Sequence, residues 1–207
     1  MIPGIFFASV GNLSELPDDL RPQVAMVGRS NVGKSSIINH LANQKQLARV
    51  SGEPGRTQTV NLYDFGGKFF LVDLPGYGFA KTAKSIRENF PTMIREYLST
   101  AEQLRMAFLI IDARIPQSPF DVEMMEWMTE QCIPFTIVMN KMDKVTKNEA
   151  FTIHQKLEEQ FPGVKRLEHS IRDGKTQKAM WGAIESAVRT PQRSSLPAFL
   201  QPMTLED

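Results

Sequence analysis

The chain has 207 residues, which suits one domain with short terminal segments, and 42% of them are hydrophobic, so a substantial core can be buried. The net charge of +1 requires neither a nucleic-acid nor a membrane partner. The single cysteine, Cys132, excludes an internal disulfide, and no apolar run reaches the ~18–20 residues that span a bilayer. The first ten residues do not resemble a signal peptide. We expect a cytoplasmic monomer with no membrane partner.

The chain begins its regular pattern with a strand, a helix and a loop. Val24–Val27 is a short apolar run that ends at Gly28 and predicts a buried strand. Lys34–Asn43 has apolar residues spaced for one helix face. The polar segment Gln44–Thr59 contains proline and glycine and predicts a loop.

A hairpin comes next, and strands then alternate with helices. Gly66-Gly67 is typical of a two-residue turn and separates two strand-like runs, Val60–Phe65 and Lys68–Asp73. Beyond the hairpin, helices are predicted at Ile86–Ser99, Phe120–Gln131, Lys147–Phe161 and Thr176–Arg189, and strands at Met106–Asp112, Ile133–Asn140 and Val164–Ser170.

Strands that alternate with helices predict an α/β fold in three layers. We expect a mostly parallel six-stranded sheet with one antiparallel strand and helices on both faces. Residues 23–189 form the predicted domain, and residues 1–22 form an N-terminal extension that packs on it. Residues 190–207 are rich in Pro, Ser and Gln and predict a mobile tail. Ligands of such sheets bind at the carboxyl ends of the strands.

One motif at such a strand end predicts a phosphate site. Two glycines with four residues between them are followed by Lys and Ser. Glycines let successive N–H groups curl around phosphate oxygens, and the helix that follows adds its positive end. The ammonium of Lys34 can reach the terminal phosphates, and the hydroxyl of Ser35 can bind magnesium. The residues expected at the phosphates are Gly28, Arg29, Ser30, Asn31, Val32, Gly33, Lys34, Ser35 and Ser36.

A second motif, Asp73-Leu74-Pro75-Gly76, follows the second hairpin strand. Asp73 can hold a magnesium-bound water, and the N–H of Gly76 can approach the terminal phosphate. In the loop between the two motifs, either Thr57 or Thr59 could complete the magnesium shell, and the local sequence leaves this choice open. The nucleotide contacts expected from this part of the chain are Gly55, Arg56, Thr57, Gln58, Thr59, Asp73, Leu74, Pro75 and Gly76.

A third motif, Asn140-Lys141-Met142-Asp143, predicts recognition of guanine. Asp143 can accept two hydrogen bonds from guanine, from the ring N–H and from the exocyclic amine. Adenine presents an acceptor where guanine presents a donor, so a carboxylate facing adenine would be left unpaired. The stem of Lys141 can cover the base, and Asn140 can tie its loop to the phosphate loop. Together the motifs predict GTP or GDP with Mg²⁺.

With these motifs the chain resembles the EngB family, also called YihA or YsxC, within the translation-factor class of P-loop GTPases. The resemblance covers Ile5 to Val188 and implies a P-loop GTPase domain that acts as a switch in large ribosomal subunit assembly. It also implies a role in normal cell division and septation, with a large-subunit precursor and its rRNA as partners. The phrases that carry it are GRSNVGKSS at Gly28–Ser36, PGRTQ at Pro54–Gln58, DLPGYGFAK at Asp73–Lys81 and NKMDK at Asn140–Lys144.

The resemblance also implies roles for single residues. It makes Thr57 the magnesium ligand. It places a third base-contacting stretch at Glu168-His169-Ser170, where the family more often has Phe-Ser-Ser. Asn140 replaces the threonine that is common in the family, which brings this position to the general GTPase pattern. The magnesium candidates are therefore Ser35, Thr57 and, through water, Asp73.

Two hypotheses concern hydrolysis. Tyr77 stands where many related switches carry a glutamine that orients the attacking water, so we expect slow intrinsic hydrolysis, with the catalytic role of Tyr77 left open. Asn31 could hold a potassium ion beside the β- and γ-phosphates, as in related GTPases, or could only stabilise a turn. The catalytic candidates are Lys34, Thr57, Gly76, Tyr77 and Asn31.

Two other functions compete with the GTPase switch. One is a guanine-nucleotide-dependent binding module in which hydrolysis is incidental. The other is an ATP-dependent P-loop enzyme, such as a small kinase, against which the Asn140–Asp143 motif argues.

Overall fold

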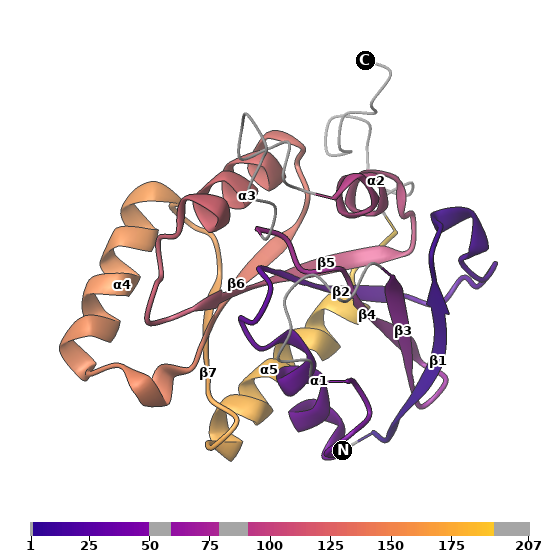
Figure 1. Ribbon diagram of the computed structural model, residues 1–207, viewed down its shortest axis with the longest axis horizontal. Helices are drawn as coiled ribbons and strands as arrows, with labels where there is room; N and C mark the ends of the chain where they lie inside the picture. The colour runs from indigo at the N-terminus through magenta and orange to yellow at the C-terminus, as the bar shows by residue number, and fades with distance from the viewer. Residues whose placement is uncertain (1, 50–58, 79–90, 193–207) are drawn as a thin grey trace.

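The computed structural model describes residues 2–49, 59–78 and 91–192. A seven-stranded sheet forms the middle layer, in the order β1-β3-β4-β2-β5-β6-β7, with helices on both faces (Figure 1). The strands are β1 Gly4–Val10, β2 Gln23–Gly28, β3 Val60–Phe65, β4 Phe69–Asp73, β5 Leu104–Asp112, β6 Phe135–Asn140 and β7 Arg166–His169.

The predicted fold class is confirmed. Strand β3 is antiparallel to both of its neighbours, β1 and β4, while the pairs on the other side of β4 are parallel. It is therefore the one strand that runs against the rest. The sheet has a seventh strand because β1, which lies in the predicted N-terminal extension, pairs with β3. No strand was predicted there, since an edge strand is defined by its partner as much as by its own residues.

Five α-helices cover the sheet within the described residues. In Figure 1, α1 and α5 lie on one face, and α2 and α3 lie on the other. Residues 86–90 of the helix predicted at Ile86–Ser99 lie outside the described residues, and the rest of that prediction corresponds to α2. None of these helices is long and apolar enough to cross a membrane. Their bounds are α1 Lys34–Ala42, α2 Thr92–Thr100, α3 Pro119–Glu130, α4 Lys147–Gln160 and α5 Gly174–Val188.

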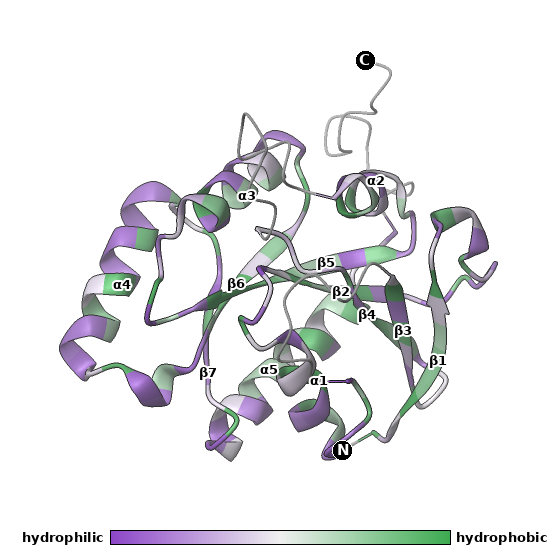
Figure 2. Cartoon of the chain, in the orientation of Figure 1, coloured by the Kyte–Doolittle hydropathy of each residue, from purple (hydrophilic) through white to green (hydrophobic). Residues whose placement is uncertain are grey.

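The core lies in two layers, one on each face of the sheet. Side chains from α2, α3 and α4 pack on one face, and side chains from α1 and α5 pack on the other. The central strand β2 is buried on both faces, as a parallel strand between helix layers must be. Figure 2 shows the matching pattern, with hydrophobic strands between helices that carry hydrophilic residues on their outer sides.

The parallel register brings the candidate site together at one edge of the sheet. Gly28 pairs with Ile110, two residues before Asp112 on β5. Asp112 in turn pairs with Asn140, and Asn140 pairs with His169. The ends of β2, β5, β6 and β7 thus lie at one edge of the sheet, where ligands of such folds bind. The division into residues 1–22, 23–189 and 190–207 stays a prediction, and residues 193–207 of the expected tail lie outside the described part of the chain.

Candidate functional site

The phosphate-loop motif connects β2 to α1, as the sequence predicts. Gly33 has a φ of 105°, and a Cβ at this position would overlap the amide nitrogen of Asn140, so only glycine fits. Helix α1 then begins at Lys34 with its first N–H groups directed into the loop. The loop therefore has the backbone geometry of an anion site at a helix N-terminus.

Lys34 and Asp73 are buried charges that face one another across this loop. The ammonium of Lys34 donates to the carbonyl of Gly28 at 3.1 Å. Burial lowers the pKa of Lys34, and the negative charge of Asp73 opposes that shift. Burial also raises the pKa of Asp73 to about 6, against the charge of Lys34 and a hydrogen bond from Ser35.

The surroundings of Asp73 fit a magnesium ion. Its Oδ1 is buried and has no hydrogen-bond partner among the described residues, and such an orphaned oxygen needs an explanation. The hydroxyl of Ser35 lies against the same carboxylate. A hydrated magnesium ion would satisfy both oxygens, because Mg²⁺ takes oxygen ligands and keeps several of its waters.

The loop between the first two motifs is only partly described. Gly55, Arg56, Thr57 and Gln58 lie outside the described residues. Thr59 directly precedes β3, and its hydroxyl donates to the side chain of Asn61 within that strand at 3.5 Å. The role of Thr57 as magnesium ligand therefore stays a prediction.

The segment after Asp73 lies directly on the phosphate loop. A Cβ on Gly76 would come within 2.8 Å of the Ser30 hydroxyl, so the close approach requires glycine. The N–H of Ser30 donates to the carbonyl of Tyr77 at 3.0 Å. The ring of Tyr77 is buried, and its hydroxyl donates to Asp121 at the start of α3. The phenol is therefore directed into the protein.

Asp121 also accepts a hydrogen bond from Arg29, with Nε and Oδ2 2.9 Å apart. One fully buried carboxylate thus joins the phosphate loop, the Tyr77 segment and α3. Burial raises the pKa of Asp121 to about 6, although Arg29 and Tyr77 both oppose this shift. No sequence pattern indicated this role of Asp121, because an acid in the first turn of a helix is common for helix stability alone.

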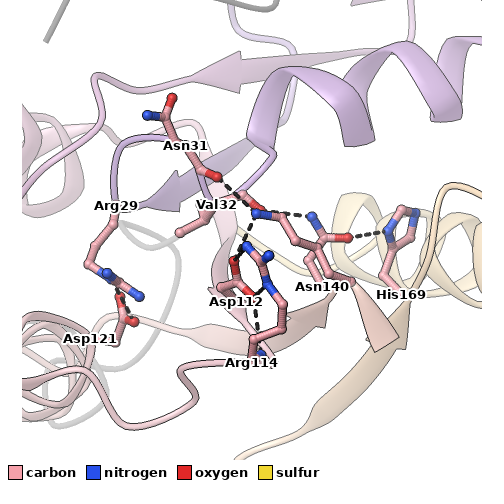
Figure 3. A network of polar contacts seen from close by, with 9 residues as sticks. Arg29, Asn31, Val32, Asp112, Arg114, Asp121, Asn140 and His169 are labelled. Carbon is pink, nitrogen blue, oxygen red and sulfur yellow. Dashed lines mark hydrogen bonds and ion pairs between the residues drawn. The ribbon is translucent and has the colours of Figure 1, made fainter. Parts of the chain in front are cut away.

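Two residues of the base motif tie it to the phosphate loop (Figure 3). The amide nitrogen of Asn140 donates to the carbonyl of Val32 at 2.8 Å. The ammonium of Lys141 donates to the carbonyl of Asn31 at 3.1 Å and to Asp112 at 2.8 Å. The side-chain amide of Asn31 points away from these contacts. Asn140 therefore lies where the sequence analysis expected it.

Asp112 anchors Lys141 and was missed by the sequence analysis. Burial alone would raise the pKa of Asp112, but hydrogen bonds from Arg114 and Lys141 outweigh burial and hold that pKa below its usual range. Its position at the end of β5, whose predicted strand precedes the one that ends in the base motif, was the signal that could have found it.

The three residues of the stretch Glu168-His169-Ser170, predicted as a third base contact, lie in different surroundings. The hydroxyl of Ser170 donates to Asp143 at 2.9 Å and helps to lower the pKa of that carboxyl. His169 is fully buried, with its Nδ1 3.0 Å from Oδ1 of Asn140. Glu168 points to the opposite face of β7, as alternate strand residues do, and bonds His154 at 2.9 Å. The structure thus brings Ser170 to Asp143 but leaves Glu168 outside the site.

Comparison with known proteins identifies the family. The family model for "50S ribosome-binding GTPase" matches residues 23–141. The "Probable GTP-binding protein EngB" of Leuconostoc mesenteroides is 45% identical over 141 residues, 68% of this chain and 73% of the relative. That of Geobacillus sp. is 41% identical over 175 residues, 83% and 90% of the two chains. The chain belongs to the EngB family of GTP-binding proteins.

Solved structures agree on the fold. A crystal structure of a probable EngB GTP-binding protein has a TM-score of 0.65 at 24% identity and covers 81% of this chain and 98% of its own. Aquifex aeolicus Era bound to GDP·AlF4⁻ has a TM-score of 0.59 at 21% identity, and the match covers 82% of this chain and 57% of the Era chain. The resemblance drawn from the motifs is therefore confirmed. This EngB-family chain is a GTPase with the α/β P-loop fold.

Proposed function

We propose that this EngB-family protein binds GTP with magnesium at the edge formed by β2, β5, β6 and β7, and hydrolyses it slowly when alone. The observation that carries the proposal is the pair of ties, Asn140 to Val32 and Lys141 to Asn31, that hold the base motif and the phosphate loop as one unit. A nucleotide that spans both motifs needs this fixed separation between its base and its phosphates.

The chain's own residues supply most of the proposed chemistry. Backbone N–H groups of Gly28–Ser36 and the ammonium of Lys34 bind and orient the phosphates. Ser35, Thr57 and, through water, Asp73 would hold magnesium, which neutralises charge on the β- and γ-phosphates when bound. Water attacks the γ-phosphorus, and the bond to the β–γ bridging oxygen breaks to give GDP and phosphate.

We expect hydrolysis without a partner to be slow because Tyr77 does not orient the attacking water as the glutamine of related switches does. Its hydroxyl already donates to Asp121 inside the protein. The N–H of Gly76, which lies against Ser30, would contact the terminal phosphate.

A change of base preference tests the proposed site. In xanthine a carbonyl replaces the exocyclic amine of guanine, so Asp143→Asn, which can donate there, should bind xanthosine nucleotides and lose guanosine nucleotides by roughly a hundredfold. Calorimetry with GDP, XDP and ADP measures this. Asp18→Asn, an exposed acid in the segment before β2, is the matched control and should keep the preference for GDP. Tight ADP binding by the unchanged protein would favour the ATP-dependent alternative.

We further propose that the nucleotide state controls docking on a large ribosomal subunit precursor in the cytoplasm, with consequences for cell division. Support comes from the family description, "50S ribosome-binding GTPase". Another GTPase with this fold, Era, has been crystallised with MgGDPNP and nucleotides 1506–1542 of 16S ribosomal RNA. Switch segments ordered by the γ-phosphate would create or remove the docking surface.

Recovery of ribosomal precursors with the tagged monomeric protein tests the switch. We expect recovery with a non-hydrolysable GTP analogue to exceed recovery with GDP about tenfold or more. Recovery that is equal in both states would contradict the switch. GTP turnover with and without the particles separates it from a binding module in which hydrolysis is incidental.

A further inference from the structure

A chain of three hydrogen bonds runs from α1 through β7 and β6 to the phosphate loop. Nδ1 of His40 lies 3.1 Å from Nε2 of His169. Nδ1 of the same His169 lies 3.0 Å from Oδ1 of Asn140, and Nδ2 of Asn140 donates to the carbonyl of Val32 at 2.8 Å. The last two contacts are drawn in Figure 3. His169 and Asn140 are both buried, so water does not replace these partners.

The chemistry of the partners fixes the direction of every bond. The carbonyl of Val32 can only accept, so Asn140 must present its NH₂ group there and its oxygen to His169. That oxygen can only accept, so the proton of His169 is on Nδ1. A neutral ring has one proton, which leaves Nε2 as an acceptor, and His40 must then carry its proton on Nδ1. Burial, together with the nearby His40, lowers the pKa of His169 to about 4, which keeps the ring neutral near pH 7.

This order has a consequence for Asn140. The two ends of an amide have nearly the same shape, so packing alone does not select between them. A flipped Asn140 would place its oxygen against the carbonyl of Val32 and its NH₂ against the N–H of His169. The carbonyl of Val32 and the N–H of His169 therefore favour the same orientation of Asn140, and the N–H of His40 selects the tautomer of His169 that supports it.

We propose that His169 and His40 are positioning residues of the nucleotide site, which together lock the amide of Asn140 in the orientation that ties the base motif to the phosphate loop. The inference rests on the proposed nucleotide site. It gives His169 a role different from the base contact that the family resemblance implied. It also makes the last turn of α1 part of the site's support, where Gln177 of α5 donates to the carbonyl of His40.

Matched substitutions of His169 test the proposal. An asparagine at this position carries its amide nitrogen about where His169 carries Nδ1, so His169→Asn keeps the donor to Asn140, whereas His169→Ala removes it. We expect His169→Ala to weaken GDP and GTP-analogue binding about tenfold and His169→Asn to stay within about threefold of the original protein. Equal affinity in His169→Ala and the original protein would overturn the inference.

Substitutions of His40 test the same chain of hydrogen bonds one residue further from Asn140, so we expect a smaller effect on binding. His40→Ala should weaken binding about threefold, and His40→Asn, which keeps a donor toward His169, should restore it. The remaining histidine of the chain, His154, lies on α4, and its ring contacts Glu168 outside the site. His154→Ala is therefore the matched control and should bind nucleotide as the original protein does. A deficit in His154→Ala as large as in His169→Ala would contradict a specific role.

Nuclear magnetic resonance of the nucleotide-free, full-length protein tests the order of the bonds without any substitution at His169. The chain has three histidines, so a long-range ¹H–¹⁵N spectrum contains three imidazoles, and His154→Ala identifies one of them. We expect the other two to carry their protons on Nδ1. A proton on Nε2 of His169 would overturn the inference even if the His169 variants failed to fold. If the original protein bound no guanine nucleotide, the proposed function would be contradicted, but the predicted tautomers would be unaffected.

Discussion

The hydroxyl of Tyr77 lies 3.0 Å from Oδ1 of Asp121 and donates a hydrogen bond to it in the protein interior. The other oxygen of the same carboxylate accepts from Arg29 of the phosphate loop. The residue that follows Gly76 is therefore held by α3 rather than placed beside the phosphates. This arrangement separates the structural use of Tyr77 from the catalytic use that its position in the sequence suggests.

Removal of the hydroxyl should therefore affect stability more than catalysis. Tyr77→Phe takes one donor from the buried Asp121, and we expect it to lower the free energy of unfolding by about 1 kcal/mol. Single-turnover GTP hydrolysis should stay within about threefold. Tyr97→Phe is the matched control, because its hydroxyl donates to Gln23 at 2.6 Å in the core. A loss of hydrolysis by orders of magnitude in Tyr77→Phe alone would show that Tyr77 is catalytic.

Substitution of Gly33 should damage both folding and nucleotide binding. Alanine there would need a φ of 105° and would overlap the amide of Asn140. We expect Gly33→Ala to destabilise the protein by about 2 kcal/mol or more and to abolish measurable GDP binding. Gly182→Ala is the opposite case, because it lies inside α5 with open space around its Cβ position. It should stabilise by about 0.5–1 kcal/mol and leave GDP binding unchanged, as melting curves and calorimetry would show.

The buried His169 should make stability depend on pH. Its folded-state pKa of about 4 lies below the ordinary value of 6.5, mainly because of burial, with the charges of His40 and Asp173 acting in opposite senses. The unfolded chain therefore binds more protons between pH 6.5 and 4, and the contribution of a lowered histidine pKa is present above that window and lost as the pH falls through it.

His169→Asn isolates this effect because the other titrating groups stay in place. The stability of the original protein relative to the variant should fall by at most about 3 kcal/mol between pH 7 and pH 4. Urea unfolding at pH 7, 6, 5 and 4 measures the difference. A difference that stays constant with pH would show that His169 titrates normally.

Potassium dependence tests the second hypothesis on hydrolysis. Asn31 is exposed, and its side-chain amide is not drawn into the contacts of the base motif (Figure 3). If it holds a potassium ion that spreads transition-state charge, hydrolysis should be roughly tenfold faster in potassium than in sodium buffer. Asn31→Ala should remove that difference while GDP affinity stays within about threefold. Equal rates in the two salts for the original protein would dispose of the hypothesis.

Several strands begin or end at other residues than predicted, and each difference has a physical reason. The strand predicted at Ile133–Asn140 begins at Phe135, because Cys132 turns the chain with a φ of 50° and Pro134 has no N–H to pair. The strand predicted at Val164–Ser170 is shorter, Arg166–His169, since its length is set by pairing with β6. Hydrophobic pattern locates a strand, but its partner decides where the strand ends.

The sequence by itself determined the fold class and the phosphate, magnesium and guanine motifs. Those features depend on residues close together along the chain, where glycine placement and hydrophobic spacing fix the local backbone. Tertiary structure alone decided that Asp121 meets Arg29, 92 positions away, and that His40 meets His169, 129 positions away. Such contacts depend on how the helices pack on the sheet, and no local pattern encodes the distance between two segments that only the folded core brings together.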